Sequence, residues 1–211
     1  MRNRTLAVFQ HHLAEGVGRI GLWAQHHNIK LVCFYAPEDL PNSLTDYDGL
    51  IVLGGPMNVA DNPVWMQTEV KLIQQALTLQ RPILAICLGA QLLATQLGGQ
   101  IIEMPAPELG WQDIRFNDGS ILTVPQWHEQ AITLPKDIAV LASSGQCPVQ
   151  MYRHQHAIGL QFHPEWDAKQ IEQLAEFFAD ECPITTGPHT QQHQTQLGQF
   201  LFELLDAQFS V

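Results

Sequence analysis

The stretch Pro82-Ile-Leu-Ala-Ile-Cys-Leu-Gly-Ala-Gln-Leu-Leu-Ala-Thr-Gln-Leu-Gly-Gly99 decides the fold, because an apolar run stops at Cys87 and a helical pattern starts at the next residue. Residues 83–86 predict a strand that is buried on both faces. Residues 88–97 carry apolar side chains at helical spacing. Cys87 therefore stands at the corner between a strand and a helix.

The neighbours of Cys87 suit a tight corner with a reactive thiol. Ala85 and Gly89 have almost no side chain, which lets the strand and the helix pass closely while the corner residue is held strained, as in a nucleophile elbow. Free amides and the positive end of the dipole at a helix N-terminus favour a thiolate and can bind an oxyanion. A buried core cysteine is the alternative, and this stretch alone leaves both interpretations open.

Two further stretches favour the reactive interpretation. Residues 48–57, Asp-Gly-Leu-Ile-Val-Leu-Gly-Gly-Pro-Met, predict a buried strand that breaks into a glycine turn. Residues 158–165, Ile-Gly-Leu-Gln-Phe-His-Pro-Glu, predict a strand that ends in a histidine and a carboxylate. Side chains two residues apart in an extended segment point the same way, so His163 and Glu165 should face one side. A thiol, an imidazole and a carboxylate form the general triad of nucleophilic catalysis.

Three motifs together carry a family resemblance. Gly54-Gly-Pro56, Ile86-Cys-Leu-Gly-Ala-Gln91 and Gly159-Leu-Gln-Phe-His-Pro-Glu165 resemble the class I, triad-type glutamine amidotransferase domain. The chain looks most like the stand-alone members that are similar to the amidotransferase domain of GMP synthase. The resemblance extends from near the N-terminus to about Trp166.

The resemblance implies roles for single residues. Cys87 would be the nucleophile, His163 the base and Glu165 the carboxylate that orients this base. The oxyanion hole would be formed by the backbone amides of Gly55 and Leu88. The candidate substrate contacts are Gly54, Gln91 and His128. Of these, His128 lies in a predicted loop, Trp127-His-Glu-Gln130, whose Glu129 and Gln130 depart from the Gly-Asp pair that is usual in relatives.

Alternating strands and helices before Gly99 predict an α/β fold, with a mostly parallel central sheet covered by helices on both faces. The resemblance identifies this as the flavodoxin-like glutamine amidotransferase fold. Short alternating segments after Gly99 predict appended antiparallel strands, at residues 100–104, 111–116 and 121–124 among others. We expect residues 1–183 to form the amidotransferase-like domain. Residues 184–211 would form a linker and an amphipathic helix, packed on the same domain or on a partner such as a second copy.

Two helices have predicted caps and buried faces. The first starts near Asp61 or Asn62, with Pro63 at its first position, and runs to about Leu79. Its predicted buried stripe consists of Val64, Val70, Ile73, Ala76 and Leu77. Asp167 should cap the second helix, whose apolar residues are expected to pack inward. These residues are Ile171, Leu174, Phe177 and Phe178.

Composition excludes several classes of protein. The 211 residues suffice for one α/β domain with a sizeable core. A net charge of −11 with only 10 Lys and Arg argues against a nucleic-acid partner. No stretch approaches the length of a membrane span and no secretory signal is evident, so we expect a cytoplasmic protein without a membrane partner.

Metal and disulfide chemistry find little support in the sequence. The 4 cysteines form no close CxxC pair and are expected to be reduced thiols. His11-His12 and His26-His27 could be metal ligands, but neighbouring side chains point apart and no third ligand is evident. We expect these histidines to lie at the surface or at strand ends. No metal and no organic cofactor is predicted.

The implied reaction hydrolyses the side-chain amide of glutamine through a γ-glutamyl thioester on Cys87. The sequence contains no phosphate-binding G-x-x-x-x-G-K-[ST] loop, so a separate synthetase subunit is expected to receive the ammonia. A γ-glutamyl peptidase acting on a small peptide or conjugate is the first alternative. A redox or chaperone protein with a reactive elbow cysteine is the second, although such a role has no need for the His-Pro-Glu sequence.

Overall fold

A central sheet organises the computed structural model, which describes residues 4–210. Its strands are β1 (Thr5–Gln10), β2 (Lys30–Tyr35), β3 (Gly49–Val52), β4 (Ile83–Ile86), β5 (Gln100–Phe116), β6 (Ile121–Thr133), β7 (Ala139–Ser143), β8 (Met151–His154) and β9 (Ala157–Leu160). They form one sheet in the order β2-β1-β3-β4-β9-β8-β7-β5-β6. The five strands from β2 to β9 pair in parallel, and the pairings from β9 to β6 are antiparallel.

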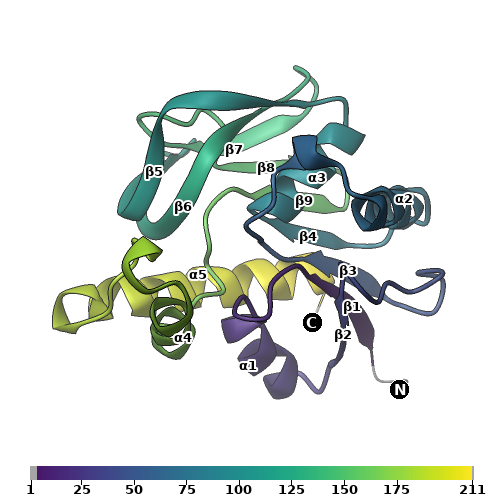
Figure 1. Cartoon of the computed structure of the whole chain (residues 1–211), viewed down its shortest axis with the longest axis horizontal. Coiled ribbons are helices and arrows are strands. Elements are labelled where there is room, and N and C mark those ends of the chain that lie inside the picture. Colours follow the sequence, from purple (N-terminus) through teal and green to yellow (C-terminus); the bar gives the residue numbers. More distant parts are fainter. Residues whose placement is uncertain (1–3, 211) are drawn as a thin grey trace.

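Helices cover both faces of the parallel half of the sheet (Figure 1). The covering helices are α1 (Gly18–His26), α2 (Val64–Thr78), α3 (Leu88–Gln96) and α5 (Gln191–Phe209). Helix α4 (Ala168–Phe178) lies apart from them and buries Ile171 and Leu174 in a separate cluster with Trp166. Alternate residues of a strand face opposite sides of a sheet. Leu6 and Val8 accordingly share a core with α1 and α5, whereas Ala7 and Phe9 share a core with α2 and α3. The predicted α/β fold class is confirmed.

The strand order brings four segments of the chain to one edge. Parallel neighbours end at the same edge of a sheet, which is where ligands bind in open α/β sheets. The segments after β1, β3, β4 and β9 begin at His11, Leu53, Cys87 and Gln161, and these four strands are neighbours in the sheet. The order of the strands is therefore enough to bring the three sequence motifs to the same edge of the sheet.

The predicted loop at Trp127–Gln130 is wrong, because these residues lie within strand β6. β6 pairs with β5 from Arg115↔Ile121 to Gln100↔Thr133, with one irregularity between Glu103 and Glu108. The strands predicted at 100–104 and 111–116 are likewise joined in the single strand β5. In the long antiparallel ribbon, pairing with β5 provides the backbone hydrogen bonds of the residues that were predicted to form this loop.

The start and the buried face of α2 differ from the prediction. The helix begins at Val64 with Pro63 as its N-cap, and Val64 is 80% exposed. The Asp61 carboxylate instead accepts a hydrogen bond from the Asn58 amide, at 3.1 Å, in a preceding 3-10 turn (Val59–Asp61). The buried residues of the helix are Met66, Glu69, Leu72, Ile73 and Ala76. Ile73 and Ala76 are thus buried as predicted, whereas Val70 and Leu77 are only partly buried and Val64 is exposed.

Helix α4 has the predicted cap but only part of the predicted face. The Asp167 side chain accepts a hydrogen bond from the Gln170 amide at 2.8 Å. Ile171 and Leu174 are buried, whereas Phe177 is 62% exposed. The Phe177 ring contacts the ring of His12 at a centroid distance of 4.7 Å, so part of its apolar surface is covered at the rim of the fold.

Helix α5 packs on the same core as α1. Its residues Leu197, Leu201 and Leu205 are fully buried, and the Trp23 indole of α1 donates a hydrogen bond to Asp206 at 2.7 Å. Two further short 3-10 turns, Ala179–Glu181 and Pro188–Thr190, lie between α4 and α5. No helix within residues 4–210 combines the length and the apolar character needed to cross a lipid bilayer.

Candidate active site

Cys87 occupies a strained corner between β4 and α3. Its φ of 49° lies in the left-handed region, which residues other than glycine rarely adopt. Gly89 is needed for this geometry, because a Cβ there would lie 2.4 Å from the Val52 carbonyl oxygen. The Cys87 amide donates to the Leu160 carbonyl at 2.7 Å, which fixes the corner to β9. The corner has the form of a nucleophile elbow.

The Cys87 thiol lines a cavity of about 300 Å³ at the carboxyl edge of the sheet. This volume suits a small ligand. The cavity contains the sequence-predicted residues Gly55, Cys87, Leu88, Gln91, His128 and His163. The remaining lining residues are Glu15, Pro56, Met57, Asn58, Trp127, Glu129, Gln130, Trp166, Phe178 and Glu181. Gly54 and Glu165 lie behind this wall.

His163 and Glu165 interact directly behind the cavity wall. The Nδ1 of His163 lies 2.8 Å from Oε1 of Glu165, and both side chains are buried. The Trp166 ring stacks on the imidazole with a centroid distance of 3.6 Å and an interplanar angle of 10°. With Nδ1 engaged by the carboxylate, Nε2 is the ring nitrogen left to act on Cys87, which lines the same cavity as His163.

The surroundings of His163 favour its protonated form. Burial alone would lower the pKa of His163, but the charges of Glu165 and Cys87 outweigh it and raise this pKa to about 10. The stacked Trp166 adds a favourable interaction with an imidazolium ring. The side-chain amide nitrogen of Gln161, Nε2, lies 3.8 Å from the Cys87 sulfur and donates a further hydrogen bond to it. The arrangement therefore favours an imidazolium at residue 163 beside the Cys87 sulfur.

The first turn of α1 fixes the position of the His-Pro-Glu segment. The Arg19 amide donates to the Glu165 carbonyl at 2.9 Å, and its guanidinium donates to the carbonyls of Pro164 and Trp166. Gly18 has a φ of 45°, and a Cβ there would lie 2.0 Å from the Glu165 carbonyl oxygen. Only glycine permits this close approach.

Two backbone amides are available beside the Cys87 thiol. The Leu88 amide is at the first turn of α3, where helical amides lack intrahelical partners. The amides on either side of it donate to protein carbonyls, from Cys87 to Leu160 at 2.7 Å and from Gly89 to Leu53 at 3.2 Å. Within residues 4–210, neither Leu88 nor Gly55 has a protein acceptor for its amide. The two amides can therefore donate to an oxyanion.

Gln91 and Gly54 differ in their access to the cavity. Gln91 lies in the first turns of α3, lines the cavity and is 5% exposed. Its side chain can reach a bound ligand. Gly54 does not line the cavity, and its carbonyl accepts a hydrogen bond from Nδ1 of His11 at 2.9 Å. The carbonyl of Gly54 therefore faces the protein core rather than a ligand.

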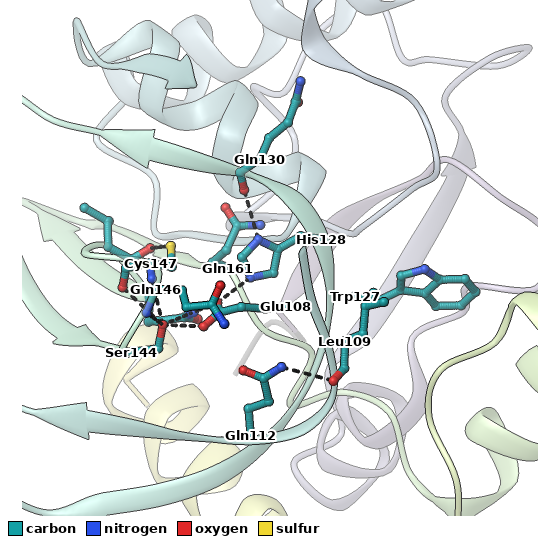
Figure 2. A network of polar contacts seen from close by, with 12 residues as sticks. Glu108, Leu109, Gln112, Trp127, His128, Gln130, Ser144, Gln146, Cys147 and Gln161 are labelled. Atoms are coloured by element: carbon teal, nitrogen blue, oxygen red, sulfur yellow. Dashed lines mark hydrogen bonds and ion pairs between the residues drawn. The ribbon is translucent and has the colours of Figure 1, made fainter. Parts of the chain in front are cut away.

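His128 forms part of the opposite wall and is held by a buried polar network (Figure 2). It lies opposite Glu108 in the β5–β6 ladder, with Nε2 3.0 Å from the Glu108 carboxylate and Nδ1 2.9 Å from the Gln130 carbonyl oxygen. Ser144 and Gln150 also donate to Glu108. Burial alone would raise the pKa of Glu108, but the adjacent His128 and the hydrogen bond from Ser144 hold it below its usual value. The buried Glu108 carboxylate therefore holds His128 in place in the cavity wall.

The same network includes Cys147, which sequence reasoning left unassigned. Ligand atoms of Glu108, His128 and Cys147 lie within 4.8 Å of one another. Burial raises the pKa of the Cys147 thiol to about 11, with a smaller contribution from Glu108. The thiol lies 3.4 Å from the Val149 carbonyl, to which it donates. These atoms already have partners within the network, which gives the cluster a structural role.

Sequence reasoning also missed Glu15. A Cβ on Gly54 would lie 3.0 Å from Oε2 of Glu15 and 2.7 Å from Cε1 of His163, so the two side chains approach the same point. Burial raises the pKa of Glu15, and the nearby Glu165 adds to this effect. A single acidic residue in a loop has no spacing pattern that could have identified it. Trp166, adjacent to the His-Pro-Glu sequence, could have been suspected from its position.

Comparison with known proteins identifies the family of the chain. The family model for glutamine amidotransferase class-I matches residues 10–180. The glutamine amidotransferase-like protein YfeJ of Salmonella typhimurium is 30% identical, over 92% of this chain and 94% of its own length. The glutamine-hydrolysing GMP synthase of Sulfurisphaera tokodaii has a subunit that is 34% identical, over 67% of this chain and 79% of its own length.

Solved structures share the fold over the whole chain. A glutamine amidotransferase of Thermotoga maritima superposes with a TM-score of 0.90 at 24% identity and covers 100% of both chains. One from Methylobacillus flagellatus gives 0.89 at 24% identity, covering 99% of this chain and 94% of its own. At this identity the likeness concerns the fold, whereas the family model spans most of the sequence. The chain therefore belongs to the class-I glutamine amidotransferase family.

Proposed function

We propose that the protein hydrolyses the side-chain amide of glutamine to glutamate and ammonia, with Cys87 as nucleophile. The observation that carries this proposal is the strained Cys87 corner, which lines one cavity together with His163, the partner of Glu165. Family membership supports an amidohydrolase that depends on cysteine.

The reaction follows from the positions of these groups. The Cys87 thiolate attacks the side-chain carbonyl carbon, and the amides of Gly55 and Leu88 stabilise the resulting oxyanion. The imidazolium of His163 gives its proton to the leaving nitrogen, so ammonia departs and a γ-glutamyl thioester remains. Water then attacks the thioester while His163 accepts a proton from it, which releases glutamate and restores the thiolate.

The ammonia is proposed to pass to a separate synthetase. The relative from Sulfurisphaera tokodaii is itself one subunit of a GMP synthase, and this supports a division of labour between two chains. The test is an assay of glutamate and ammonia released from glutamine by the purified protein. Equal amounts of the two products are expected. Full recovery of the glutamine, both without and with added synthetase, would contradict the proposal.

Hydrolysis of a γ-glutamyl conjugate is the second candidate. Three carboxylates, Glu15, Glu129 and Glu181, line the cavity, and no Lys or Arg is among its described lining residues. Such a wall favours a conjugate whose leaving group is a neutral or cationic amine. Values of kcat/KM for glutamine and for γ-glutamyl amides of basic, neutral and acidic amines separate the two candidates. A clear preference for the basic amide over glutamine would favour the conjugate.

A further inference from the structure

A buried histidine lies beneath the glycine turn that borders the cavity. His11 follows β1 and is fully buried. Its Nδ1 lies 2.9 Å from the Gly54 carbonyl oxygen, and its Nε2 lies 2.8 Å from the carboxylate of Glu69 on α2. Gly55 packs directly on this side chain, because a Cβ at residue 55 would lie 2.6 Å from the Cβ of His11.

The contact with Gly54 also orients the amide of Gly55. The carbonyl of one residue and the amide of the next belong to one planar peptide unit, and in the trans form they point in opposite directions. No peptide bond in the described chain is cis. Because His11 holds the Gly54 carbonyl toward the core, the Gly55 amide points the other way, toward the cavity that Gly55 lines.

Both ring nitrogens of His11 face oxygen atoms, so a ring protonated at both positions satisfies both contacts. Burial alone would lower the pKa of His11, but Glu69 and, less strongly, the Gly54 carbonyl raise it above the usual value. A charged donor on the carbonyl polarises the peptide unit and strengthens its amide as a donor. Glu69 in turn is fully buried, which explains an acidic residue on the inner face of α2.

We propose that His11 and Glu69 are positioning residues that hold the Gly54–Gly55 peptide so that the Gly55 amide donates to the oxyanion. This inference rests on the proposed amidohydrolase function. It assigns His11 no contact with the substrate. It explains why the turn needs two glycines. A side chain at residue 54 would meet the His163 ring, and one at residue 55 would meet His11.

The test compares acyl transfer with simple alkylation of Cys87. Hydrolysis of glutamine forms an oxyanion, whereas iodoacetamide alkylates a thiolate by displacing iodide and forms none. The double variant His11→Leu/Glu69→Met replaces the buried pair by apolar groups and leaves no buried charge alone. We expect kcat to fall by about 10²-fold, as for loss of an oxyanion donor, with KM nearly unchanged. The rate of alkylation at Cys87 should stay within about threefold of wild type, because the triad is intact.

Two further variants sharpen the result. His11→Asn keeps a donor near the position of Nδ1 but loses the charge, and kcat should lie between those of the wild type and the double variant. His26→Ala on α1 removes an exposed histidine and should leave kcat unchanged. Wild-type kcat in the double variant overturns the inference, as does alkylation slowed in proportion to kcat. A wild type that cleaves neither glutamine nor γ-glutamyl amides overturns the proposed function as well.

Discussion

The parallel and antiparallel halves of the sheet contribute different things to the cavity. In the parallel half, the ends of β1, β3, β4 and β9 deliver the groups proposed for the chemistry. In the antiparallel half, β6 contributes one wall through Trp127–Gln130. Strand order alone brings the first set together, whereas the second depends on the register of a long ribbon. The two halves should therefore respond differently to substitution.

The two halves also differ in how they hold their residues. The parallel half uses backbone strain at Cys87, whose φ is 49°, and the close approach of Gly18 to the Glu165 carbonyl. The antiparallel half uses a buried carboxylate, Glu108, that accepts hydrogen bonds from several side chains. Strain fixes the reacting atoms within narrow limits, while a hydrogen-bonded wall can change without moving them. The parallel half is thus expected to control kcat and the antiparallel half KM.

The largest effect is expected for Cys87→Ser, since a hydroxyl in place of the thiol is a far weaker nucleophile under the same base. Turnover of glutamine should fall by about 10⁴-fold or more. Isothermal titration with glutamine should still detect binding. The matched control is Cys33→Ser, which changes an exposed cysteine and should keep full activity. Comparable rates in the two variants would show that Cys87 is not the nucleophile.

A smaller but still large effect is expected for Glu165→Gln. Loss of the carboxylate removes the orienting partner of His163, and kcat should fall by about 10³-fold. Among the groups that raise the pKa of His163 to about 10, Glu165 contributes most. Its loss should lower this pKa, so the alkaline limb of kcat/KM should move to lower pH in the variant. A pH–rate profile with an unmoved alkaline limb would contradict this assignment.

The same substitution has a signature in stability. The pKa of His163 is higher in the folded protein, about 10, than its ordinary value of 6.5. Its contribution to the free energy of unfolding is therefore fully present below pH 6.5 and is lost as the pH rises toward 10. The difference in unfolding free energy between wild type and Glu165→Gln should shrink over this range. Urea titrations at several pH values measure it.

An intermediate effect is expected for Gly18→Ala, in which a methyl group meets the Glu165 carbonyl at a left-handed position. A displacement of about 1 Å in the His-Pro-Glu segment should lower kcat by about 10²-fold. The control is Gly145→Ala, where a Cβ meets nothing within 4 Å. Steady-state kinetics and thermal unfolding of both variants provide the comparison. Equal kcat in both would mean that the start of α1 does not position the triad.

The smallest effect is expected in the antiparallel half, for Glu108→Gln. The variant keeps the shape of the side chain but weakens the hold on His128, so KM should rise by up to about tenfold, equivalent to one hydrogen bond. Because the triad is untouched, kcat should change little. Michaelis–Menten kinetics on glutamine separates the two parameters. A loss of kcat as large as that of Glu165→Gln would remove the distinction between the halves.

Much of the parallel half could be predicted from sequence because its strands are short runs rich in apolar residues, which end where the pattern changes. The strand at Ile83–Ile86 was predicted with the observed ends. The strand-to-helix corner at Cys87 was likewise evident from the switch in periodicity. These features depend on neighbouring residues, which a sequence displays directly.

The features that escaped prediction depend on contacts between distant residues. The His11–Glu69 pair spans 58 positions, and the buried stripe predicted for α2 contained only apolar residues. The strand character of Trp127–Gln130 comes from pairing with β5 rather than from its own pattern. Glu15 acquires its place only when the loop after β1 folds against the glycine turn. Local spacing contains no information on such contacts.

Mass spectrometry after treatment with a glutamine-analogue electrophile, such as a diazo ketone, tests most directly whether the gathered strand ends form a reactive centre. Peptide mapping is predicted to find one adduct, on Cys87, with the exposed Cys33 and the buried Cys147 unmodified. An excess of glutamine should protect Cys87 from the reagent. An adduct on another cysteine, or none on Cys87 in a protein that hydrolyses glutamine, would contradict the account.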